Sequence, residues 1–291
     1  MLEKPYSCLN GQYLRAHRAA VAVSDRGFRF GDGVFETIRL ESGVPYQWET
    51  HLARLAAGLA ALRIPAPEVD WADAARRLMR KNKSGDGFLR LAVSRGAGSR
   101  GYLPHPPAMP ATWLIEQLPP LPAPDAPCRL WLSARPRVPL PCLPVNAKLA
   151  QGVGSTLALM EAQDHACDEA LQLTTSGLLC ETASANLFWI QGGIVFTPSL
   201  DTGCLAGTTR EALLRLSPAP TRMVAEEIAA LESAEAVFVS NTRLGIWPVS
   251  SLQPMGWTWP TRHPLLAQLQ QALTQDRADY THNNHAAWQR K

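Results

Sequence analysis

The sequence predicts a two-domain α/β (α+β) protein, and three observations support this fold class. The chain has 291 residues, 46% of them apolar, which is enough for one large or two smaller cores. Strand patterns and amphipathic helix patterns alternate on both sides of its middle. Between them, PPLPAP at 119–124 interrupts both patterns, and 13 of the 24 prolines fall within 104–144. We therefore expect a small N-terminal domain over 1–118, a proline-rich linker over 119–127 and a larger C-terminal domain over 128–291.

The N-terminal part predicts short strands around two helices. Alternating apolar residues predict the strands, and leucines at helical spacing predict the first helix. The predicted elements are a strand at 20–23, a hairpin over 35–48 that turns at Ser42-Gly43, a helix over 49–64 capped by Thr50, a helix over roughly 70–82 and a strand at 88–96.

The C-terminal part predicts a second set of strands and three helices. Glycine pairs with serine or glycine mark its turns, and the spacing of apolar residues marks its helices. The predicted elements are a strand at 128–134, a helix over 147–166, short strands over 169–198 with turns at Ser176-Gly177 and Gly192-Gly193, a helix over 208–216, two strands within 237–252, a helix over 263–275 and a frayed tail over 278–291.

Composition and charge exclude several classes of protein. The net charge of +3 is mild, and no run of Lys or Arg forms the basic patch of a nucleic-acid-binding protein. The N-terminus lacks the apolar segment of a signal peptide, and no stretch reaches the ~20 apolar residues of a membrane span. The six cysteines form no C-x-x-C pair. We therefore expect a cytoplasmic protein without a metal site.

One lysine and three later features have the order of a pyridoxal phosphate site. Lys148 supplies an amine that can form a Schiff base, and Glu181 supplies a carboxylate for a pyridinium nitrogen. The Gly-Thr-Thr-Arg turn at 207–210 precedes an apolar helical run, where backbone N–H groups and hydroxyls can bind a phosphate. Each feature is common alone, but together, with Asn186 between them, they indicate this cofactor.

Lys148 is the strongest Schiff-base candidate. It has apolar neighbours and stands at the start of a predicted helix, a setting that suits such chemistry. The alternative is a solvated helix lysine. Besides the C-terminal residue, the chain has only Lys4, Lys81 and Lys83, and the last two lie in the polar sequence KNKSGDG. Elimination therefore favours Lys148.

Each of the other candidates has an ordinary alternative. Glu181 is either the partner of the ring nitrogen or an edge-strand glutamate. Thr208 and Thr209 either bind a phosphate or cap a helix, and Thr242 can add a hydroxyl after the strand VFVS. Arg54 lies on the leucine face of its helix, where it is either buried with an anionic partner or extended along the surface.

The glycine-rich loop RGAGSRGY at 95–102 carries two arginines and a tyrosine. It lacks the G-x-x-x-x-G-K-[ST] spacing of a nucleotide-binding P-loop. Because the guanidinium group binds carboxylates through two hydrogen bonds, Arg95 and Arg100 suit an acidic substrate. The alternative is a solvated hairpin turn.

Taken together, these residues resemble the fold-type IV pyridoxal phosphate enzymes, the class IV aminotransferase family. This family includes branched-chain aminotransferases, D-amino acid aminotransferases and 4-amino-4-deoxychorismate lyases. The resemblance spans most of the chain, in the expected order. The motifs that carry it are SDRGFRFGDGVFETIR at 24–39, HLARL at 51–55, Lys148, ETASANLFW at 181–189 and LAGTTR at 205–210.

The resemblance implies a D-amino acid aminotransferase-like fold with pyridoxal phosphate in the cleft between two domains. It also implies a homodimer in which a loop of one subunit completes the site of the other. Lys148 would be the Schiff-base lysine and proton carrier, and Glu181 would pair with the pyridine nitrogen. The phosphate ligands would be Arg54, Thr208, Thr209 and Thr242, and the substrate-binding residues would be Arg100, Tyr102, Thr37 and Asn186.

Within the family, the lyases are the best match. SRGAGSRGYLP at 94–104 is similar to their R-G-x-G-x-R-G-Y loop, and NLFW followed by Thr197-Pro198 is also lyase-like. Branched-chain aminotransferases place a tyrosine five residues after the lysine, where this chain has Val153. D-amino acid aminotransferases place a tyrosine where this chain has Phe35. Both departures weaken these alternatives, which stay open.

The lyase resemblance implies a specific reaction. The amine of 4-amino-4-deoxychorismate displaces Lys148, Lys148 removes the proton at C4, and the enolpyruvyl group leaves as pyruvate. The other product, 4-aminobenzoate, feeds folate synthesis. An aminotransferase would instead return the proton to the cofactor and would need a 2-oxo acid. A non-catalytic protein on this fold is a third alternative, which the intact set of Lys148, Glu181 and 207–210 disfavours.

Overall fold

The computed structural model describes residues 5–98, 100–104, 109–140, 142–144 and 146–289. The chain folds into two compact units. The first consists of Met1–Pro122, Ala147–Gln151 and Arg277–Lys291, and the second of Ala123–Asn146 and Gly152–Asp276.

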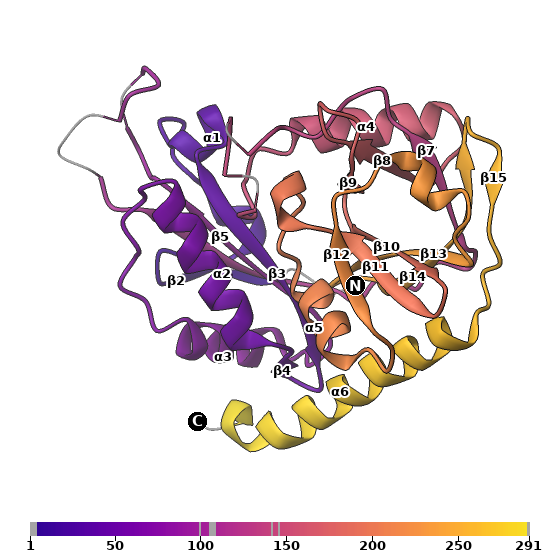
Figure 1. Ribbon diagram of the computed structural model, residues 1–291. Helices are drawn as coiled ribbons and strands as arrows, with labels where there is room; N and C mark the ends of the chain where they lie inside the picture. Colours follow the sequence, from indigo (N-terminus) through magenta and orange to yellow (C-terminus); the bar gives the residue numbers. More distant parts are fainter. Residues whose placement is uncertain (1–4, 99, 105–108, 141, 145, 290–291) are drawn as a thin grey trace. The chain divides into compact units, whose positions relative to one another are not determined.

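The first unit is an antiparallel sheet with two helices packed on it (Figure 1). Its strands follow the order β2-β1-β6-β5-β3-β4. Their bounds are β1 Tyr6–Leu9, β2 Gln12–Arg15, β3 Gly33–Glu41, β4 Val44–Pro45, β5 Gly87–Ser94 and β6 Thr112–Leu118. The helices are the short α1 Arg26–Phe30, and α2 Trp48–Ala61 and α3 Trp71–Asn82, which contact the sheet.

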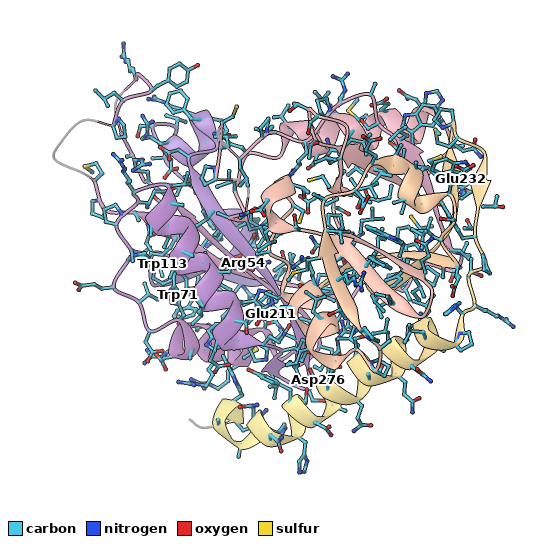
Figure 2. The ribbon with its side chains drawn as sticks, viewed as in Figure 1. Arg54, Trp71, Trp113, Glu211, Glu232 and Asp276 are labelled. Atoms are coloured by element: carbon cyan, nitrogen blue, oxygen red, sulfur yellow. The ribbon has the colours of Figure 1, made fainter. Side chains whose placement is uncertain are left out.

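Alternation along β3 explains which face of this sheet is buried. Val34, Ile38 and Leu40 are 0–2% exposed and pack in the core with leucines of α2 and α3. Trp71 of α3 packs edge-on against Trp113 of β6, with ring centroids 5.4 Å apart (Figure 2). The predicted hairpin is confirmed, because β3 and β4 pair across Ser42-Gly43 and both turn residues have positive φ.

The second unit is a nine-stranded sheet that closes on itself. Its order is β12-β11-β10-β13-β14-β7-β8-β9, with β15 on β14, and β9 pairs back with β10. The bounds are β7 Cys128–Leu132, β8 Glu169–Leu173, β9 Leu179–Thr182, β10 Asn186–Gln191, β11 Ile194–Pro198, β12 Thr221–Val224, β13 Ala236–Asn241, β14 Gly245–Gln253 and β15 Trp257–Thr258. The closing pair is Glu181 opposite Asn186, so the fold places these two predicted site residues side by side.

Three helices accompany this sheet. Helix α4, Val153–Asp164, packs on β7 and β8, and α5, Thr208–Leu216, packs on β13. Helix α6, Pro264–Gln289, contributes Leu266, Leu269 and Leu273 to the core of the second unit. Among the described residues, none of the helices combines the length and the apolar character that a membrane crossing requires.

Three predictions of local structure were wrong. Residues 20–23 form no strand. Helix α2 begins at Trp48 with Gln47 as its N-cap, so Thr50 lies inside the helix and does not cap it. The predicted frayed tail is helical to Gln289, because the last turns of α6 bury Trp288 against Trp48, with ring centroids 4.9 Å apart.

The segment around Lys148 was also predicted wrongly as helix. Helix α4 starts only at Val153, and residues 148–150 are instead extended along the edge of β3. This pairing explains why Ala147–Gln151 groups with the first unit, although the predicted boundaries put it in the C-terminal domain. The aromatic contacts of α6 with Tyr46 and Trp48 likewise explain why Arg277–Lys291 groups with the first unit. The other change of unit, at Ala123, falls within the predicted proline-rich linker.

Candidate functional site

Backbone pairing with β3 fixes the position of Lys148 in the first unit. The carbonyl oxygen of Lys148 accepts a hydrogen bond from the Phe35 N–H at 3.0 Å, and Ala150 donates to Gly33 at 2.9 Å. Leu149 forms an antiparallel bridge with Val34. The lysine is therefore held by the edge of a sheet and not by the helix start predicted from the sequence.

Lys148 shares one face of this sheet with several other polar side chains. Its Nζ lies 4.7 Å from the centroid of the Phe35 ring, and the Arg90 guanidinium carbon lies 4.4 Å from the same centroid. Thr37, a predicted substrate-binding residue, is the cross-strand partner of Arg90. An amine and a guanidinium thus meet one aromatic ring, beside a hydroxyl.

A buried ionic network lies next to these residues in the first unit. Arg54 of α2, labelled in Figure 2, donates from Nε and Nη2 to the two oxygens of Glu36 at 2.7 and 2.6 Å. His51 Nδ1 lies 2.7 Å from Glu36 Oε2. Burial alone would raise the pKa of Glu36, but the hydrogen bonds and charges of Arg54 and His51 outweigh it and lower that pKa. Arg54 is therefore a largely buried arginine with an anionic partner, and its side chain is 11% exposed.

Because of this network, we expect the folded protein to lose stability as the pH falls below neutral. Burial, opposed by the hydrogen bond to Glu36, lowers the pKa of His51 below its ordinary value of 6.5. As pH falls through that value, the unfolded chain binds a proton that the folded chain does not, so folding is weakened. We expect the urea midpoint to be lower at about pH 5.5 than at about pH 7.5, and His51→Gln to reduce this difference. An unchanged difference in His51→Gln would contradict the prediction.

The glycine-rich loop is anchored by one of its own arginines. Arg95 donates to both oxygens of Asp32, at 2.7 and 2.9 Å, and to the carbonyls of Leu62 and Arg63. Gly96 has φ 83°, and a Cβ there would lie 2.2 Å from the Pro110 carbonyl oxygen. Arg95 thus has a structural role, so only one of the two loop arginines suits substrate recognition.

The second half of the loop is held through its backbone carbonyl groups. Arg26 of α1 donates to the carbonyls of Gly101 and Tyr102 at 2.8 and 2.6 Å. The side chains of Arg100 and Tyr102 remain exposed, Tyr102 at 85%. Tyr102 also contacts the Phe30 ring, with centroids 5.3 Å apart. Ser99 lies outside the described residues.

Glu181 is the centre of the candidate site in the second unit. It is 5% exposed, and its Oε1 lies 2.9 Å from Arg137 Nη2. Its Oε2 accepts hydrogen bonds from the Leu205 N–H at 3.0 Å and from Asn186 Nδ2 at 3.3 Å. A buried carboxylate with three charged or N–H donors is fixed in place. The alternative of an edge-strand glutamate does not hold, because β9 pairs with both β8 and β10.

The first turn of α5 gathers the predicted phosphate-binding threonines. Thr208 and Thr209 are 2–3% exposed and open the helix after its N-cap, Gly207. The hydroxyl oxygens of Thr208 and Thr242 lie 3.4 Å apart. A Cβ at Gly207 would lie 2.0 Å from Asn186 Oδ1, so glycine lets the backbone approach the Glu181 network closely. The helix N-terminus, with its dipole and hydroxyls, suits an anion.

Four polar residues that lie near the candidate site residues of the two units were not predicted as site residues: Glu36, His51, Arg90 and Arg137. The sequence does carry a signal for Glu36, since it interrupts the apolar face of β3 between Val34 and Ile38. His51 has the same signal, because it lies four residues before Leu55 on α2. Arg90 and Arg137 are identified only by their contacts in the folded units.

The residues present fit pyridoxal phosphate. The first unit offers the amine of Lys148 and the guanidinium of Arg54, and the second offers the carboxylate of Glu181 and the hydroxyl-rich start of α5. These donors match an aldehyde, a phosphate and a pyridinium nitrogen, the groups by which the cofactor is held.

Comparison with known proteins agrees with this chemistry. The family model for amino-transferase class IV matches residues 33–252. A Methanocaldococcus jannaschii protein, provisionally named a branched-chain-amino-acid aminotransferase, is 32% identical over 247 residues, covering 83% of this chain and 85% of its own.

Two solved structures show the fold. The 4-amino-4-deoxychorismate lyase from Pseudomonas aeruginosa is 30% identical with a TM-score of 0.80, covering 93% of this chain and 98% of its own. The Escherichia coli branched-chain amino acid aminotransferase is 25% identical with a TM-score of 0.86, covering 94% of each chain. These matches confirm the predicted fold class.

Proposed function

This chain belongs to the class IV aminotransferase family, whose members depend on pyridoxal phosphate, and from that premise we propose that it is 4-amino-4-deoxychorismate lyase. In the proposed reaction, 4-amino-4-deoxychorismate is converted to 4-aminobenzoate and pyruvate. The proposal includes a homodimer and a cytoplasmic location, both expected from the resemblance and the composition.

Each cofactor ligand has a proposed role. Lys148 would hold the aldehyde end, and Glu181 would accept a hydrogen bond from the ring nitrogen. When bound, pyridoxal phosphate supplies an electron sink that stabilises negative charge beside the substrate amine. The phosphate would be held by Arg54, Thr208, Thr209 and Thr242.

Lys148 would also carry the proton in the proposed reaction. Once the substrate amine has displaced it, its free amine removes the proton from C4 of the substrate. The C3–O bond then breaks, the ring becomes aromatic, and the enolpyruvyl group leaves and takes up a proton as pyruvate. Lys148 is suited to this because its backbone is pinned to β3 while its side chain stays beside Phe35.

The observation that carries the choice of lyase is the loop at 95–102. Arg95 and Arg26 hold its backbone, and this leaves Arg100 and Tyr102 projecting from it. A second guanidinium, that of Arg90, packs against the Phe35 ring, which the Lys148 amine also contacts. Two such groups suit a substrate with two carboxylates, as 4-amino-4-deoxychorismate has. Thr37, opposite Arg90, and Asn186, beside Glu181, are weaker candidates for the pocket.

A branched-chain aminotransferase is the second candidate. The similarity to the Methanocaldococcus jannaschii protein favours it, and the guanidinium of Arg90, which packs on the same Phe35 ring as Lys148, suits the single carboxylate of an amino acid. Against it stands Val153, an exposed residue at the first position of α4, where such enzymes place a tyrosine. A D-amino acid aminotransferase stays a weaker alternative.

A product assay separates these activities. The protein, loaded with pyridoxal phosphate, is incubated with 4-amino-4-deoxychorismate and no 2-oxo acid. We expect equal amounts of 4-aminobenzoate and pyruvate over many turnovers, because elimination regenerates the cofactor. The matched reaction supplies L- or D-amino acids with 2-oxoglutarate. Amino transfer in that reaction, with no release of 4-aminobenzoate in the first, would contradict the lyase and support an aminotransferase.

A further inference from the structure

We propose that Glu36 and His51 are positioning residues that fix the guanidinium of Arg54 for a phosphate monoester, the anion carried by pyridoxal phosphate. The inference rests on the proposed function, because it takes Arg54 as a phosphate ligand. It deepens that function by giving roles to two buried residues that do not themselves meet cofactor or substrate.

Burial distinguishes the three members of this network. The side chains of Glu36 and His51 are each 1% exposed, and that of Arg54 is 11% exposed. Of the three, Arg54 therefore keeps the most surface available to a ligand. Glu36 and His51 lie behind it, where a carboxylate and an imidazole are costly to bury unless they hydrogen bond to each other or to a charge.

The hydrogen bonds fix the plane of the guanidinium. Glu36 accepts from Nε and Nη2 of Arg54 through separate oxygens, a two-point contact that prevents rotation of the group. His51 lies 2.7 Å from Oε2, the oxygen that also accepts from Nη2, so the carboxylate cannot turn either. Arg54 is thereby held in one orientation before any anion binds, which lowers the entropy cost of binding it.

Stability alone does not account for this network. Replacing a buried ion pair by apolar residues of similar size is often neutral or stabilising. Glu36 stands between Val34 and Ile38 on the apolar face of β3, where a leucine or valine would continue the core. Unlike a leucine or valine, a carboxylate at this position can hold the guanidinium of Arg54 in one orientation.

The same strand carries the anchor of Lys148. The N–H of Phe35, the residue before Glu36, donates to the Lys148 carbonyl at 3.0 Å. The support for the proposed phosphate ligand and the support for the proposed aldehyde ligand are therefore consecutive residues of β3. Because pyridoxal phosphate is rigid apart from its phosphate arm, fixed anchors at both ends favour its binding.

Comparing two ligands isolates the contribution of the phosphate group to binding affinity. The dissociation constants of pyridoxal 5′-phosphate and of pyridoxal, which lacks the phosphate, are measured for the apoprotein by visible absorbance. The dissociation constant of pyridoxal divided by that of pyridoxal 5′-phosphate reports what the phosphate contributes to affinity, and this quotient is called the ratio below. For Glu36→Gln we expect the ratio to fall about tenfold, as when the outer partner of a ligand residue is removed, with the affinity for pyridoxal unchanged. The glutamine amide would direct N–H donors at Arg54 and His51, and so release the guanidinium.

A double variant, a control and a reserve variant complete the experiment. In an Arg54→Gln background, Glu36→Gln should cause no additional fall in the ratio, because its effect passes through Arg54. The control is Glu41→Gln on the same strand, whose partner Arg39 lies 2.6 Å away with both side chains 30% exposed. It should leave the ratio unchanged. If Glu36→Gln does not fold, His51→Gln tests the same expectation.

Three outcomes would overturn the inference. An equal loss of affinity for both ligands would mean that Glu36 only supports the fold. A higher ratio, with a stronger salt dependence, would mean that Glu36 competes with the phosphate. An unchanged ratio in Arg54→Gln would remove the premise that Arg54 binds the phosphate. Failure of the lyase assignment is distinct, because it would appear in the product assay while these ratios stay as expected.

Discussion

Lys148→Ala is expected to lower turnover by about 10²–10⁴-fold, the range that a positioned proton-transfer group contributes. The reason is that Lys148 is proposed both to hold the cofactor and to remove the C4 proton. Because its backbone hydrogen bonds to Phe35 and Gly33 do not involve the side chain, the variant should keep its fold. Turnover is measured as release of 4-aminobenzoate, and the fold is checked by circular dichroism.

Lys81→Ala is the matched control for this prediction. Lys81 is an exposed lysine on α3 in the same unit, and it lies among the aromatic rings of Tyr6 and Tyr13, away from β3. Its loss should leave turnover unchanged. Normal turnover in Lys148→Ala would show that another amine carries the cofactor.

Glu181→Gln is expected to lower turnover by roughly 10²–10³-fold, the size of effect seen when one electrostatic group aimed at developing charge is removed. Glutamine has nearly the same shape, but it cannot balance the charge of Arg137, which lies 2.9 Å from Glu181 Oε1. It would also fail to favour a protonated ring nitrogen, so the cofactor would lose its electron sink. The measurements are turnover and the visible absorbance of the bound cofactor.

Glu211→Gln provides the control in the second unit. Glu211 is an exposed glutamate of α5, labelled in Figure 2, two residues beyond the buried threonines. The same substitution there should change neither turnover nor absorbance. If Glu181→Gln behaves like this control, Glu181 is not the partner of the ring nitrogen.

Local signals in the sequence were sufficient where structure depends on local chemistry. The helix over 208–216 was predicted with its observed bounds, because a glycine and two threonines precede an apolar repeat. The turn at Ser42-Gly43 was predicted for a similar reason, since a Ser-Gly pair between two strand patterns is a local turn signal. The order of Lys148, Glu181 and the threonines after Gly207 identified the family, which the comparison then confirmed.

Tertiary contacts decided what the sequence could not show. Residues 148–150 have helical composition, but the open edge of β3 supplies hydrogen bonds that an isolated segment lacks. The end of α6 looks polar and frayed, yet Trp288 finds a buried site against Trp48. Arg137 lies in a proline-rich segment with no periodicity, so its contact with Glu181 is visible only in the fold.

Specificity is the part of the function that one sequence defines least. The cofactor chemistry depends on a few residues with fixed roles, whereas the choice between elimination and amino transfer depends on which groups meet the substrate. In the proposed site those groups would be Arg90 on a strand and Arg100 and Tyr102 on an exposed loop. Loops vary more than the elements that carry them, so similar scaffolds can support either reaction.

The most direct test of the central claim is to locate the cofactor on the chain. The protein loaded with pyridoxal phosphate is reduced with sodium borohydride, digested, and analysed by mass spectrometry for the lysine that retains the cofactor. We expect the label on Lys148 alone, in a peptide that also contains Ala147 and Leu149. A label on Lys81 or Lys83, or a label spread over several lysines, would contradict the assignment of Lys148 and the chemistry built on it.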